Sequence, residues 1–248
     1  MGEQGVAIPL LGRNANVKPV SGGPELIRKV LLTCGILSSL LYIAMNALIP
    51  MQWEGYSYAS RVVSELSAVG APTRSVWVVL GIAYAVLMAA FGWGVWASAA
   101  GNRALRIVGG LLIAYGIFDI VPWPPMHQRE VLAVGGGTLS DTLHIVWSFV
   151  AVLFMMVAMG FGATAYGKRF RIYTIATILI LAGLGVLTGM AKPQIEANLP
   201  TPWAGVWERI SIAGFLLWVV VLAIGLLRRP SAAASSPPLR ICGEGARG

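Results

Sequence analysis

The sequence is poor in charged residues and in the residue types that usually carry metal or redox chemistry. Only 11% of its 248 residues are charged, whereas about a quarter are charged in a soluble domain. Of its two cysteines, Cys34 lies in an apolar run and Cys242 near the end of the chain, so we expect no disulfide framework. There are two histidines, and no Cys/His spacing is typical of a zinc site. These scarcities exclude a soluble globular domain and a disulfide scaffold, and we expect no metal and no cofactor.

Apolar residues are abundant and fall in long runs. They make up 57% of the chain, and the mean hydropathy is +0.75. The runs are roughly 20 residues long, which is the length that a helix needs to cross the core of a bilayer. We therefore predict an all-α fold, a polytopic membrane helix bundle whose partner is the lipid bilayer. The six predicted transmembrane helices cover residues 30–49, 75–96, 105–121, 141–166, 172–191 and 206–227.

The predicted domain organisation has a membrane domain between two tails. Residues 1–29 are expected to be a flexible cytoplasmic N-terminus, residues 30–228 the six-span domain, and residues 229–248 a disordered cytoplasmic tail. After the first span, apolar residues recur every three or four positions from Ser57 to Val69. This periodicity predicts a short amphipathic helix, which is too short and polar to span and would lie at the extracytoplasmic interface.

The charges indicate the orientation of the spans. A net charge of +8 would suggest nucleic acid in a soluble protein, but here the cations gather on one side of the predicted topology. By the positive-inside rule that side is cytoplasmic, so we predict a multi-pass protein of the plasma membrane with both termini inside and no nucleic-acid partner. Most acidic residues fall on the outer side: Glu54, Glu65, Asp119, Glu130, Asp141, Glu196 and Glu208.

Two patterns within the spans predict how the helices pack. Ser39, Tyr42 and Asn46 recur at helical spacing in the first span and form a polar stripe, which we expect to face other helices. Gly185 and Gly189 have the G-x-x-x-G spacing in the fifth span, which permits close helix contact.

The loop between the third and fourth spans and the helix start that follows it supply candidate catalytic residues. Asp141 and His144 are three residues apart at the start of the fourth span and project from nearly one face. A carboxylate beside an imidazole suits proton transfer or ligand binding. Alternatively, Ser140 or Asp141 caps the helix. His127 lies in the loop and is expected to be a solvated surface residue.

Asp119, Glu208 and Arg209 are the remaining ionisable candidates at the outer ends of the spans. Asp119 ends an apolar run, so its carboxylate needs a cation or hydrogen-bond donors. Glu208 and Arg209 are adjacent on a helix and point in different directions, so each should pair with a different residue. The alternatives to a ligand role are ion pairs: Asp119 with Arg61, Arg129 or Arg209, Glu208 with Arg61 or Arg74, and Arg209 with Asp119, Asp141 or Glu65.

Several of these positions resemble a known family. The pattern Ser64-Glu65-Leu66-Ser67 followed by Gly70 to Arg74, the Asp119-x-x-Pro122 end of the third span, His144, and the Glu208-Arg209 start of the last span are similar to the prokaryotic multi-pass family called domain of unknown function 998. The resemblance covers roughly residues 30–228. It implies a six-helix integral membrane protein and no particular activity.

A more distant resemblance is to the superfamily of membrane hydrolases that includes alkaline ceramidases. That resemblance implies a serine, an aspartate and three histidines around a metal. The chain has Ser64 or Ser67, Asp119 and His144, but neither a third histidine nor a His-x-x-x-His pair.

Three functions follow as hypotheses, and whether the chain is an enzyme stays open, as does its oligomeric state. The first is an outward-facing polar pocket that binds or moves a small polar or lipid head-group ligand; the second is an intramembrane hydrolase; and the third is a structural or accessory membrane subunit. For the second, the candidate catalytic residues are His144, Asp119 and Asp141. For the first, the predicted binding residues are Ser64, Glu65, Ser67, Asp119, His144, Glu208 and Arg209.

Overall fold

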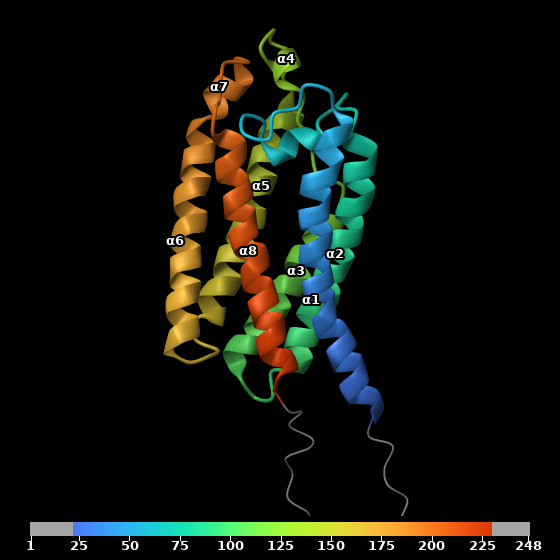
Figure 1. Cartoon of the computed structure of the whole chain (residues 1–248), viewed down its shortest axis with the longest axis vertical. Coiled ribbons are helices and arrows are strands. Elements are labelled where there is room, and N and C mark those ends of the chain that lie inside the picture. Colours follow the sequence, from blue (N-terminus) through green and yellow to red (C-terminus); the bar gives the residue numbers. More distant parts are fainter. Residues whose placement is uncertain (1–21, 230–248) are drawn as a thin grey trace, which may run out of the picture.

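A computed structural model describes residues 22–229, and these residues form a helical bundle without a β-strand. Residues 1–21 of the predicted N-terminus (1–29) and residues 230–248 of the predicted tail (229–248) lie outside the described residues. The long helices run alternately up and down and are joined at the two ends by short segments (Figure 1). The helices are α1 (Gly22–Leu48), η1 (Ile49–Gln52), η2 (Val63–Ser67), α2 (Arg74–Ala97), α3 (Arg103–Ile120), α4 (Arg129–Leu132), α5 (Leu139–Gly162), α6 (Lys168–Met190), α7 (Lys192–Glu196) and α8 (Ala204–Leu227).

Within the described residues, five helical stretches are long and apolar enough to cross a membrane. Their outward surfaces carry large apolar side chains such as Val79, Phe149 and Leu179, as expected where lipid replaces water. The fold is therefore that of a multi-pass membrane protein. The five stretches are Gly23–Gln52, Arg74–Ala97, Leu139–Gly162, Lys168–Glu196 and Ala204–Leu227.

α3 corresponds to the remaining predicted span. It has 18 residues, and Arg103, Arg106 and Asp119 put charges near both of its ends. These charges shorten its apolar part, so a sixth crossing stays a prediction. α3 nevertheless lies within the bundle, packed between α2 and α5.

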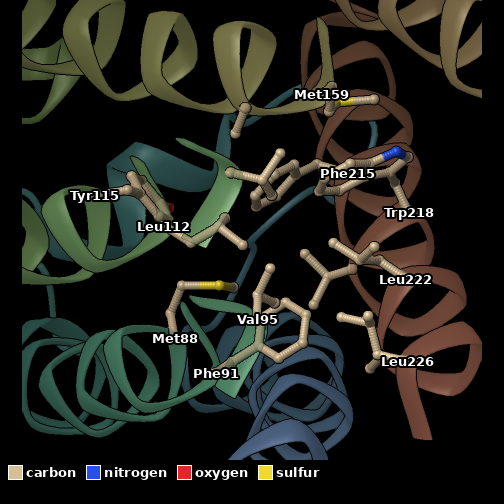
Figure 2. Packing of buried hydrophobic residues seen from close by; sticks show 14 of the residues in the cluster. Met88, Phe91, Val95, Leu112, Tyr115, Met159, Phe215, Trp218, Leu222 and Leu226 are labelled. Carbon is tan, nitrogen blue, oxygen red and sulfur yellow. The ribbon is translucent and has the colours of Figure 1, made fainter. Parts of the chain in front are cut away.

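The core lies at the centre of the bundle, where α2, α3, α5 and α8 meet. Met88, Leu112, Phe215 and Trp218 are among its fully or almost fully buried side chains (Figure 2). The indole N–H of Trp218 donates a hydrogen bond of 3.0 Å to Oγ1 of Thr174 on α6. The buried polar group is thus paired, as a low-dielectric interior requires.

Small residues allow α2 and α3 to approach closely. A Cβ on Gly92 would lie 2.6 Å from the amide nitrogen of Ile113, and one on Gly109 would lie 2.6 Å from that of Trp96. The prediction for the fifth span differs from what is found, because Gly185 and Gly189 of α6 have open space where a Cβ would lie. No helix among residues 22–229 packs against them.

Ser39 and Tyr42 of the predicted polar stripe face other helices, as predicted, whereas the Asn46 amide bonds the carbonyl of Tyr42 on its own helix. Ser39 is fully buried and its hydroxyl donates a 3.2 Å bond to the carbonyl of Leu216 on α8. The ring of Tyr42 contacts those of Trp77 and Tyr84 on α2. The stripe therefore joins α1 to both of its neighbours.

α1 begins earlier than the predicted boundary at residue 30. Its first turns are fixed by Arg28, which bonds Glu25 at 2.7 Å and the carbonyl oxygens of Leu226 and Arg229 at 3.3 Å each. These contacts hold the start of α1 against the end of α8. Residues 22–29 are therefore part of the bundle and not of a flexible terminus.

The opposite end of the bundle is closed by what we call the cap, residues 49–73, 121–138 and 191–203. It includes η1, η2, α4 and α7 and lies at the top of Figure 1. The predicted helix Ser57–Val69 is here a loop followed by the five residues of η2. The carbonyls of Tyr58, Ser60 and Arg61 accept bonds from side chains of α8 and the cap, which hold this stretch in its loop conformation.

Candidate functional site

η2 places a glutamate at the centre of the cap. Val63 and Leu66 are buried against Met45 and Trp77 of the bundle, which fixes the short helix on top of α1 and α2. The Glu65 side chain turns back to accept a 2.9 Å hydrogen bond from the amide of Val62. This geometry aims the carboxylate into the cap, where its residue is 0% exposed.

Arg129 of α4 is the main partner of Glu65. Its Nε donates to Oε1 at 2.8 Å and its Nη2 donates to Oε2 at 2.7 Å. Two parallel bonds of this kind are the strongest form of side-chain ion pair. The Arg129 side chain is only 7% exposed, so the pair is buried, and both charges depend on each other for solvation.

The same arginine ties a third segment into the cap. Its Nη1 donates to the hydroxyl of Thr201 at 3.2 Å, and that hydroxyl donates to the carbonyl of Ser60 at 2.8 Å. Burial acts to lower the pKa of Arg129, but the hydrogen bonds and charge of Glu65 outweigh it and raise the pKa above its usual value. Arg129 is thus held in its charged form and joins all three cap segments.

Arg61 makes the second ionic contact of Glu65. Its Nη1 lies 3.1 Å from Oε1 of Glu65, and its Nη2 lies 2.5 Å from Oε1 of Glu130. Its guanidinium also lies 4.8 Å from the ring centre of Trp53, a cation–π contact. Two acids and two arginines therefore alternate in one network, Glu130–Arg61–Glu65–Arg129.

Glu208 and Arg209 fasten the cap loop to α8 through its backbone. The Glu208 carboxylate accepts from the amide of Val63. Nη1 of Arg209 donates to the carbonyls of Tyr58 and Arg61 at 2.9 and 3.0 Å. The predicted ion pairs of these two residues are wrong, because among residues 22–229 neither forms a salt bridge. Their partners are backbone groups and, for Arg209, also the Tyr56 hydroxyl, and charge pairing reveals neither kind of partner.

Tyr56 and Gly205 complete this attachment. The Tyr56 hydroxyl accepts a 2.7 Å bond from Nη2 of Arg209, and burial raises its pKa to about 12, so the hydroxyl stays neutral. Gly205 lets the loop lie directly on α8, since the amide of Gly205 donates a 2.9 Å hydrogen bond to the carbonyl of Ala59. A Cβ there would meet the Tyr58 carbonyl at 2.5 Å.

His127 and Asp141 form a pair that the sequence interpretation missed. Nδ1 of His127 lies 3.0 Å from Oδ2 of Asp141, and the His127 amide donates to Oδ1 at 2.7 Å. Asp141 also accepts from the amide of Thr138 at 2.8 Å, which completes the capping box of α5. Asp141 is therefore a helix-capping residue, although the N-cap is Thr138 and not Ser140 or Asp141. The prediction of a solvated His127 is wrong.

His144 stands apart from both aspartates. Its Nδ1 lies 2.8 Å from the carbonyl oxygen of Pro124, and a carbonyl only accepts, so the proton is on Nδ1. Its Nε2 is buried and has no partner among the described residues. Of the predicted site residues, His144 and Arg209 each keep a buried nitrogen without a partner within residues 22–229, Nε2 in His144 and Nε in Arg209.

Asp119 and the two serines do not form a catalytic arrangement with it. Asp119 is partly buried at the end of α3 and has no salt bridge within the described part of the chain, so the ion pairs expected for it are wrong. The Ser67 hydroxyl donates to the carbonyl of Ser64 at 3.0 Å. Within residues 22–229, no hydrogen bond joins His144 to Asp119, Asp141 or either serine.

None of the predicted site residues lines either of the two grooves described on the surface. One, of about 290 Å³, is lined by Met190 of α6, Thr201 of the loop between α7 and α8, and Trp207 of α8, among others. The other, of about 400 Å³, lies at the far end of the bundle. In the described ranges, no three His, Cys, Asp or Glu side chains come close enough together to hold a metal ion.

Sequence reasoning missed Arg129 and Thr201 as members of the central network. Arg129 could have been found, since a fully buried Glu65 requires a cation and the outer side has few. Thr201 offered no such signal, because a hydroxyl in a proline-rich loop has no distinctive pattern.

Comparison with known proteins supports the family resemblance. A family model described as "Protein of unknown function (DUF998)" matches residues 36–225. The match covers well over half of the chain, so the chain belongs to this family, as its motifs predicted. No curated protein and no solved structure matches it.

Proposed function

We propose that this member of the DUF998 family is a structural or accessory subunit of the plasma membrane. In this proposal α3 is the sixth span, both termini are cytoplasmic, and the cap is a fixed extracytoplasmic surface. The observation that carries it is the state of Glu65. Its two oxygens accept from Arg129, Arg61 and the amide of Val62, which leaves little capacity for a ligand.

Two other residues that were candidates to bind a ligand are occupied in the same way. Arg209 is bonded to the cap backbone and to Tyr56, and Asp141 is bonded to His127 and Thr138. Apart from the bond between Thr138 and Asp141 inside the capping box, each contact joins residues at least 14 positions apart in the sequence. Residues used in this manner fix the cap, and a fixed cap suits a protein that presents a surface or supports other subunits.

The test compares two matched glutamates of the full chain purified in detergent. Glu65→Gln removes a buried charge that is paired with two arginines. Glu196→Gln removes a charge that is paired with Lys192 at the surface, where the side chains of Lys192 and Glu196 are 46% and 44% exposed. Breaking a buried pair costs about 3–5 kcal/mol, so Glu65→Gln should lower the Tm by roughly 10 °C or more. Glu196→Gln should change it by about 2 °C or less.

A ligand screen completes this experiment. Small polar metabolites and lipids added to the unchanged protein should leave its Tm unaltered. The proposal is overturned if Glu65→Gln behaves like Glu196→Gln. It is equally overturned if a metabolite raises the Tm of the unchanged protein and fails to do so in Glu65→Gln, because the pair would then belong to a binding site.

One observation favours a second function, the binding of a small polar ligand. The bare Nε2 of His144 is a buried hydrogen-bond acceptor, and such groups usually find a partner. His144→Asn keeps a donor for the carbonyl of Pro124 and removes Nε2. A ligand whose stabilising effect is lost in His144→Asn, with the Tm of the free protein unchanged, would support this function; no such ligand in the screen would remove it.

A further inference from the structure

A groove opens between α6 and α8 at the end of the bundle opposite the cap. Its volume is about 400 Å³, within the range of small-molecule sites. The wall is apolar and the rim is cationic. It is lined by Tyr166, Phe170, Val221, Ile224, Gly225 and Arg228, and no carboxylate is among these residues.

The polar groups at the groove are the Tyr166 hydroxyl and the guanidinium groups of Arg228 and Arg229. The Tyr166 hydroxyl is buried and has no hydrogen-bond partner among residues 22–229. Burial raises its pKa, against the opposing charge of Arg229, so the hydroxyl keeps its proton and can donate. The guanidinium of Arg229 lies 3.9 Å from the ring centre of Tyr166, and the exposed Arg228 completes the rim.

Glycine keeps this site open. A Cβ on Gly225 would lie 3.3 Å from the Tyr166 hydroxyl, which is closer than ordinary contact. The absence of a side chain at Gly225 therefore lets Tyr166 approach α8 and leaves its buried hydroxyl without a partner among residues 22–229.

The position of the groove indicates its occupant. It lies where two membrane-crossing helices end, next to the exposed cations Lys168, Arg169 and Arg171. A phospholipid presents an acyl chain and a charged head group together at this depth of a bilayer. Basic pockets between transmembrane helices bind anionic head groups by this arrangement.

We propose that this groove is a binding site for an anionic phospholipid. One acyl chain lies along Phe170, Val221 and Ile224, the phosphate faces Arg228, and the Tyr166 hydroxyl donates a hydrogen bond to a phosphate or ester oxygen. The site is independent of the cap and of any function proposed for it.

The experiment titrates the purified full chain with phosphatidylglycerol or phosphatidylcholine and counts bound lipid by native mass spectrometry. Phosphatidylglycerol should bind more tightly. Arg228→Gln should weaken it about fivefold, the contribution of one cation near a head group. Tyr166→Phe should weaken it roughly tenfold, as for a bond to a charged group. Arg103→Gln is the control, because it removes an exposed arginine of the same end from outside the groove.

A second readout separates binding from folding. Without lipid, Tyr166→Phe should unfold at the same or a higher temperature than the unchanged protein, since it removes an unpaired buried hydroxyl. The proposal is overturned if both lipids bind equally, if Arg103→Gln weakens binding as much as Arg228→Gln, or if soluble glycerol phosphate displaces the lipid at equal concentration. The last result would assign the site to a free anion.

Discussion

Glu65 and Arg129 face each other through two hydrogen bonds of 2.8 and 2.7 Å although they are 64 residues apart in the chain. One lies in the 3-10 helix after the first span and the other in the short helix α4. Because the pair is buried, each charge is stabilised mainly by the other, and dissolved salt screens their attraction little. The pair joins the cap segments 49–73 and 121–138 to each other.

The attachment of the cap to α8 should be intolerant of a methyl group at Gly205. In Gly205→Ala the added Cβ would lie 2.8 Å from Nη1 of Arg209 and closer still to the carbonyl of Arg61. Overpacking of this kind costs about 1–3 kcal/mol, and a thermal unfolding measurement would detect it. Gly183→Ala on α6 is the control, since nothing lies within 4 Å of its Cβ. Equal stability of the two variants would show that the loop does not rest on α8.

Arg209 should not be replaceable by lysine. Its guanidinium serves three carbonyls through Nη1 and the Tyr56 hydroxyl through Nη2, and a single ammonium cannot reproduce this fork. We expect Arg209→Lys to speed hydrogen exchange in residues 57–67 at least tenfold, corresponding to about 1.4 kcal/mol. Arg74→Lys, at a position with one carbonyl bond to Ser67, should change exchange less. Similar effects of both variants would refute the role given to the fork.

Asp141 should stabilise the second cap segment and not take part in catalysis. Asp141→Ala removes the capping box of α5 and both bonds to His127. The loss of a helix cap costs about 0.5–2 kcal/mol, so unfolding should shift modestly and cleavage of residues 121–138 by an added protease should increase. Ser148→Ala, which loses only a bond to the carbonyl of His144, is the comparison. An unchanged cleavage rate in Asp141→Ala would contradict this role.

The sequence predicted the long helices and the end of the bundle at which the acids gather, because both follow from the positions of the apolar runs and the charges along the chain. It also predicted that Ser39 faces another helix, since helical spacing alone places it. The partners of Glu208 and Arg209 were not predictable in this way. They are backbone groups and the Tyr56 hydroxyl of a loop whose path depends on the packing of Val63 and Leu66.

Two predictions that were made from residue spacing are wrong for the same physical reason. The residues around Val62 have a helical period, yet side chains from α8 and Thr201 take the carbonyls of the loop. Gly185 and Gly189 have a contact spacing, but the close approach occurs at Gly92 and Gly109. The periodicity of a sequence shows which residues share one face of a helix. It does not show which neighbouring element that face contacts.

The most direct test of the account is a double-mutant cycle on Glu65 and Arg129. Glu65→Gln, Arg129→Gln and the double variant are unfolded at equilibrium in mixed micelles, and the coupling free energy is taken from the four stabilities. We predict that each single change costs about 3–5 kcal/mol. The double change should cost less than their sum, by about 2 kcal/mol or more. Additive losses, with coupling near zero, would contradict the claim that this pair holds the cap together.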